Sequence, residues 1–99
     1  MNNYPRFRDF AREEHPLEGK KKRLDNILNI EILIHDFKIS KSKIREGNYA
    51  TIQFSLNGNN EKYVVFTGSQ VIIDQLEKYK DKLPFYATIV KKYNYYSLS

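Results

Sequence analysis

The tetrapeptide Asn57-Gly58-Asn59-Asn60 separates two short segments of strand-like sequence. Asn and Gly tolerate positive φ, which makes this the strongest hairpin signal in the chain. In residues 49–56 apolar and polar side chains alternate, as in a half-buried antiparallel strand. Residues 61–67 are rich in β-branched and aromatic residues. We therefore expect residues 49–56 and 61–67 to form two antiparallel strands joined at this turn.

A third alternating segment precedes this hairpin. Ile30, Ile32 and Ile34 alternate, and β-branched residues dominate residues 30–39. The phase then shifts, because Phe37 and Ile39 fall on the other parity. A bulge or bend near His35 and Asp36 would explain the shift, and we expect these two residues to form a structural pair.

The segment after the hairpin has the signals of a helix. Thr67 and Gln70 have capping-box spacing, and Ser69 is an alternative cap. Pro84 prevents continuation of the helix. Four apolar residues share one helical face, namely Val71, Ile72, Leu76 and Tyr79. Residues 85–91 and 95–98 then resemble two further strands, with a turn at residues 92–94.

The order of these elements predicts a fold class. Three strands, a helix and two more strands is the order of the OB-fold, a five-stranded Greek-key barrel that binds oligonucleotides. Barrel closure also removes the exposed edges that an open antiparallel sheet would have. We expect a mainly β protein in which residues 24–99 form this barrel. Residues 1–23 would be a short irregular or helical extension, with helical turns near Phe7 and Phe10.

The same region resembles a known group of proteins. The runs YVVFTGSQVIIDQLEKY (residues 63–79) and LPFYATI (residues 83–89) resemble small OB-fold proteins of phages and mobile elements in low-GC Gram-positive bacteria. Those proteins look like single-stranded-DNA-binding modules. The resemblance implies the same fold and function here, but it defines no set of ligand-binding residues.

Composition favours an anionic partner. The chain has 99 residues, a formal net charge of +5 and a pI near 9.4, with eight Tyr and six Phe. A basic surplus favours nucleic acid, and Tyr interleaved with Lys is typical of surfaces that stack unpaired bases. The codon usage of an AT-rich genome would explain the same composition. The sequence contains no cysteine and no apolar run of membrane-spanning length. We expect its N-terminal segment not to be a secretory leader and the protein to lie in the bacterial host cytoplasm.

The predicted hairpin places particular residues on its two faces. Ile52, Phe54, Tyr63 and Val65 would share the interior. The outer face would carry Tyr49, Gln53, Lys62 and Phe66, which we expect to bind nucleic acid. An exposed Phe is suited to stack on a base. As alternatives, Phe7 and Phe10 could fold back over Phe66, or a one-residue bulge could reverse the two faces.

Cations gather beside two predicted loops that lie on one side of an OB barrel. The first loop carries Lys38, Lys41, Lys43 and Arg45, and the last hairpin carries Lys91, Lys92, Tyr93 and Tyr95. These residues complete the predicted site, where lysines would neutralise phosphates and tyrosines would stack on bases. A solvated basic edge is the alternative. The basic run at residues 20–23 is either a solvated loop or a phosphate contact.

No catalytic motif is recognisable. His15 and His35 lack the spacing of a zinc site, and phosphate-binding glycine loops and serine elbows are missing. We expect no enzyme, metal or cofactor. The predicted function is non-sequence-specific binding of single-stranded DNA, with RNA as the alternative strand. A protein-binding OB module, such as a phage inhibitor or adaptor, is the rival function, and a homo-oligomer is a further alternative.

Overall fold

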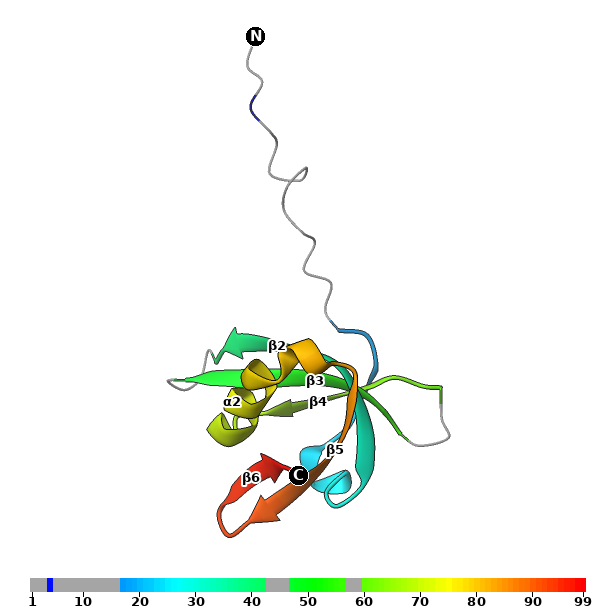
Figure 1. Ribbon diagram of the computed structural model, residues 1–99, viewed down its shortest axis with the longest axis vertical. Helices are drawn as coiled ribbons and strands as arrows, with labels where there is room; N and C mark the ends of the chain where they lie inside the picture. The colour runs from blue at the N-terminus through cyan, green and yellow to red at the C-terminus, as the bar shows by residue number, and fades with distance from the viewer. Residues whose placement is uncertain (1–3, 5–16, 43–46, 57–59) are drawn as a thin grey trace.

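The computed structural model describes residue 4 and residues 17–42, 47–56 and 60–99. The described chain is mainly β, as expected, with one α-helix (Figure 1). The elements in order are β1 (Lys20–Lys21), a 3₁₀ turn η1 (Leu24–Asn26), β2 (Glu31–Lys41), β3 (Asn48–Leu56), β4 (Tyr63–Thr67), α2 (Gln70–Lys78), a 3₁₀ turn η2 (Lys80–Lys82), β5 (Phe85–Lys92) and β6 (Tyr95–Leu98). The expected helical turns near Phe7 and Phe10 lie outside the described residues.

The strands form one six-stranded mixed sheet in the order β1-β4-β3-β2-β5-β6. All neighbours are antiparallel except β1 and β4, which are parallel. The five expected strands are confirmed, and β1 is an unexpected sixth. Within the described part of the chain, no strand pairing joins the two ends of this order. The expected barrel is therefore not closed by the pairings, and α2 packs against both β3 and β6 instead.

A bulge in β2 is confirmed where the sequence predicted it. The register of β2 against β3 shifts between Ile34 and Asp36, so His35 is the extra residue. Before the bulge β2 also pairs with β5, and beyond it β2 pairs with β3 alone. The predicted pairing of His35 with Asp36 is wrong. His35 Nε2 lies 3.0 Å from Ser55 Oγ, while the Asp36 carboxylate accepts a hydrogen bond from the Phe37 backbone N–H.

The cap of α2 is Ser69 rather than Thr67. Ser69 Oγ accepts a hydrogen bond from the Ile72 backbone N–H and donates one of 2.7 Å to the Tyr96 carbonyl. It therefore satisfies one of the unpaired N–H groups of the helix and also joins the helix to β6. The buried face consists of Ile72, Ile73 and Leu76. Val71 and Tyr79, expected on that face, are exposed.

The core lies between the inner face of the sheet and α2. The predicted interior of the β3–β4 hairpin is confirmed by the cross-strand pairs Ile52↔Val65 and Phe54↔Tyr63. Phe54 has no exposed surface, and its ring stacks on that of Tyr63 with centroids 5.7 Å apart. Phe54 and Tyr63 therefore link the core to the start of β4.

Replacing Phe54 with Ala should lower the free energy of unfolding by about 3–5 kcal/mol, because it removes a fully buried ring and leaves a cavity. Tyr86→Ala provides a matched control, since Tyr86 is 63% exposed, and should cost about 1 kcal/mol or less. Urea denaturation measures both variants. Equal losses would contradict this description of the core.

Candidate nucleic-acid interface

A groove of about 210 Å³ crosses the outer face of β2, β3 and β4. The face arises from strand parity, because Thr51 pairs with Phe66 and Lys38 pairs with Thr51 across the sheet. The residues that line it are Leu17, Lys38, Ser40, Tyr49, Thr51, Val64 and Phe66. Of the predicted site residues, the structure therefore brings Lys38, Tyr49 and Phe66 together in one groove.

The bulge at His35 gives this groove its cation. Because β2 contains one extra residue, Lys38 and Ser40 point to the outer face, while Phe37 and Ile39 pack against the core. Lys41, at the end of β2, is exposed and pairs with Asn48. The predicted contacts Lys43 and Arg45 lie outside the described residues.

Residues 17–22, which we call the strap, lie along β4 and cover part of this face. The Lys20 backbone N–H donates to the Lys62 carbonyl at 3.0 Å, and the Lys22 N–H donates to the Val64 carbonyl at 2.8 Å. The Gln53 side-chain amide donates to the Glu18 carbonyl at 2.9 Å. Gln53 is consequently only 9% exposed. Gln53 was predicted to contact a base, but its side-chain nitrogen already donates a hydrogen bond to the strap.

The strap also places a cation beside the exposed ring of the groove. Phe66 is 41% exposed, as its predicted role requires. The Lys21 ammonium lies 5.0 Å from the centroid of the Phe66 ring, within the range of a cation–π contact. The Tyr49 ring meets the Phe66 ring edge-on, with centroids 6.2 Å apart. Two aromatic rings that line the groove and one lysine thus form a cluster.

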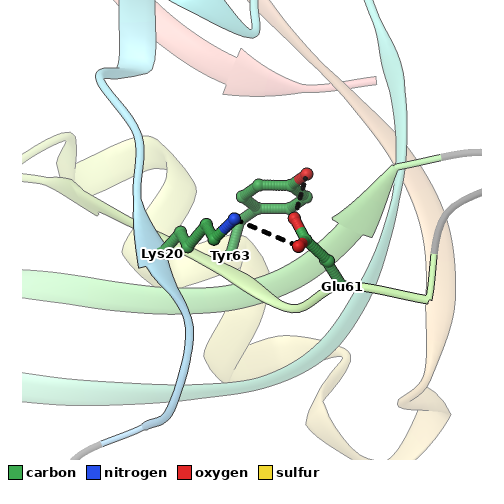
Figure 2. A network of polar contacts seen from close by, with 3 residues as sticks. All are labelled: Lys20, Glu61 and Tyr63. Atoms are coloured by element: carbon green, nitrogen blue, oxygen red, sulfur yellow. Dashed lines mark hydrogen bonds and ion pairs between the residues drawn. The ribbon is translucent and has the colours of Figure 1, made fainter.

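The other side of the strap is fastened to β4 by a polar network (Figure 2). The Lys20 ammonium donates to Glu61 Oε1, and the Tyr63 hydroxyl donates to Glu61 Oε2, each at 3.0 Å. The hydrogen bond from Lys20, aided by the one from Tyr63, lowers the pKa of Glu61. The hydrogen bond to Glu61 raises the pKa of Lys20. An exposed ion pair contributes little to overall stability, but it can fix the position of a short segment.

Gly19 explains why the strap can lie so close to β4. A Cβ at this position would lie 2.8 Å from the Tyr63 carbonyl carbon, and the φ of Gly19 is +154°. Both the contact and the backbone conformation exclude other residues. The sequence pattern could not place Lys21 on this face, because a two-residue strand has no periodicity. Gly19 beside a basic run is the signal that could have indicated it.

The β5–β6 hairpin carries the second predicted group of cations and rings. Lys91 pairs with Tyr96 across the hairpin, and its ammonium lies 5.6 Å from the Tyr96 ring centroid. Tyr93 is 97% exposed in the turn, and Tyr95 and Lys92 are exposed beside it. None of these residues lines the groove. The helix α2, which contacts both β3 and β6, packs on the core side of the sheet. Figure 1 shows the β5–β6 turn on the same side of the view as the end of β2.

The described residues contain neither a candidate metal cluster nor a membrane-spanning helix. Residues 4, 17–42, 47–56 and 60–99 hold no cluster of three or more His, Cys, Asp or Glu side chains suited to a metal ion. No helix in these ranges has the length and apolar character needed to cross a membrane.

Comparison with known proteins identifies a family. Residues 18–99 match the family described as a domain of unknown function (DUF8468), and the chain therefore belongs to that family. The matched region begins within the strap and includes every strand of the sheet. The comparisons with curated proteins and with solved structures found no match.

Replacing Lys20 with Met should raise the pKa of Glu61 toward its ordinary value, because the largest cause of its lowering is removed. Since that pKa is lowered in the folded chain, this interaction supports the strap at neutral pH and is lost as the pH falls through the lowered value. Titration of the Glu61 carboxyl by NMR measures the change. Lys80→Met is the control, and an unchanged Glu61 pKa in Lys20→Met would contradict the network.

Proposed function

We propose that this chain is an OB-type module that binds single-stranded nucleic acid, most readily DNA, without sequence specificity. One observation carries the proposal: a groove on the outer face of β2, β3 and β4 holds Lys38 together with the rings of Tyr49 and Phe66. Stacking on exposed rings and neutralisation of phosphates are the two interactions that non-specific single-strand binders combine.

The strand order supports the OB-type assignment. The run β4-β3-β2-β5-β6, with α2 between β4 and β5, has the order of strands and helix that the OB-fold requires. The helix packs against both β3 and β6 and contributes its apolar face to the core. In the OB-fold, oligonucleotides bind on the second and third strands, which correspond here to β3 and β4.

The binding path would continue beyond the groove at both ends. Lys41 extends it along β2, and Lys43 and Arg45 follow in the sequence. The β5–β6 hairpin, whose turn lies on the same side of Figure 1 as the end of β2, would add Lys91, Lys92, Tyr93 and Tyr95 to that end of the path. Lys62, exposed before β4, would act at the strap end. Gln53 would support the strap instead of contacting a base, because its amide donates to Glu18.

Binding of a fluorescent oligothymidine of about ten nucleotides tests the proposal at low salt. We expect micromolar or tighter binding that weakens steeply with salt, because each neutralised phosphate releases counterions. Phe66→Ala should weaken binding by about 1–3 kcal/mol, the contribution of one stacked base. Tyr86→Ala, which removes an exposed ring that does not line the groove, is the matched control. Absence of binding near micromolar protein, or equal effects of the two variants, would contradict the proposal.

A second candidate function is protein binding, and a specific cavity favours it. A pocket of about 320 Å³ lies between the end of α2 and β5, lined by Tyr79, Phe85, Tyr86, Leu98 and others. Its lining is mostly apolar, as in pockets that accept a partner's side chain. This function would be favoured by a defined partner protein that binds with one-to-one stoichiometry. Tyr86→Ala should abolish that binding, and oligothymidine should not displace the partner.

A further inference from the structure

Successive lysines of the strap point to opposite faces of the sheet. Because β1 pairs with β4 in register, Lys20 lies opposite Tyr63 and Lys21 opposite Val64. The Lys22 ammonium lies 5.1 Å from the Tyr63 ring centroid, on the same side as the Lys20–Glu61 contact. Lys21 alone of these three lysines reaches Phe66. The strap therefore presents a cation on the groove face.

The strap is built into the sheet edge. Its two backbone hydrogen bonds to β4 and the bond from Gln53 to Glu18 would all be broken if a ligand displaced it. Displacement would also expose Val64, which is only 7% exposed, and would leave the Gln53 amide without its acceptor. A nucleic-acid strand that enters the groove therefore meets the strap in place.

Leu17 and Lys21 lie at the groove in different positions. Leu17 lines the groove directly, whereas Lys21 contacts Phe66 from outside the groove lining. The Phe66 ring therefore borders the groove and also contacts the Lys21 ammonium. A base stacked on Phe66 would have its phosphate one sugar away, and the Lys21 side chain is exposed and able to act there as a point charge.

We propose that the strap is a fixed wall of the single-strand site, and that Lys21 is a phosphate-contacting residue of that wall. Gly19 and the Lys20–Glu61–Tyr63 network are the positioning residues, because they hold the strap against β4. This inference rests on the proposed function and adds a binding residue to it. It also gives a role to the basic run, whose alternative interpretation was a solvated loop.

The first test compares Lys21→Ala with Lys80→Ala, which removes the same charge from the exposed η2 turn. Each variant is titrated with fluorescent oligothymidine at several salt concentrations. Loss of one phosphate contact should weaken binding about five- to tenfold near 50 mM salt and reduce the log–log salt slope by about 0.7. Lys80→Ala should stay within about twofold of the original protein.

The second test moves the strap without changing any charge. In Gly19→Ala the added Cβ would collide with β4, so the strap should detach while the core remains folded. Faster hydrogen exchange at the Lys20 and Lys22 amides, with an unchanged circular dichroism spectrum, would report that detachment. Binding should weaken about as much as in Lys21→Ala. The double variant should be little weaker than either single one, because both changes remove the same contact.

Three results would overturn the inference. Tighter binding by Gly19→Ala would show that the strap is a cover rather than a wall. Multiplicative effects in the double variant would show that Gly19 does not act through Lys21. Equal oligothymidine affinity of Lys21→Ala and Lys80→Ala would refute the proposed phosphate contact, even if Gly19→Ala failed to fold. In each case binding by the original protein would leave the proposed function standing, whereas its failure to bind oligothymidine would end both proposals.

Discussion

The extra residue at His35 in β2 is the constraint on which both the core and the groove depend. Side chains alternate along a strand, so one inserted residue exchanges the faces of everything beyond it. With the bulge, Phe37 and Ile39 pack against the core while Lys38 and Ser40 reach the outer face. Without it, two apolar side chains would face solvent and a lysine would face the core.

The strap couples the groove to the interior of the protein. Tyr63 stacks on the fully buried Phe54 with its ring and donates to Glu61 with its hydroxyl. Glu61 in turn holds Lys20, and the next residue of the strap lies over Phe66. Gly19 permits this arrangement because no side chain fits between the strap and β4. The shape of the outer face of the sheet therefore depends on contacts that begin in the core.

Local sequence patterns determine much of this fold. Alternation and the Asn-Gly turn indicated β3, β4 and their shared register, and the phase shift indicated the bulge in β2. The capping pattern left Thr67 and Ser69 as candidate caps of the helix. The structure uses Ser69, whose hydroxyl also donates a hydrogen bond to the Tyr96 carbonyl of β6. By contrast, β1 could not be predicted, because a two-residue parallel pairing depends on a distant partner and leaves no periodic pattern. For the same reason the engagement of Gln53 and the position of Lys21 required the structure.

An NMR titration of the isotopically labelled chain with unlabelled oligothymidine tests whether the groove and the strap form one single-strand site. We expect the backbone amide shifts to gather at Lys38, Thr51 and Phe66 and along the strap, with Lys21 among the most affected. These shifts should saturate together and weaken with added salt. Shifts confined to the pocket beside Tyr79 and Tyr86, or no saturable shifts, would contradict such a site.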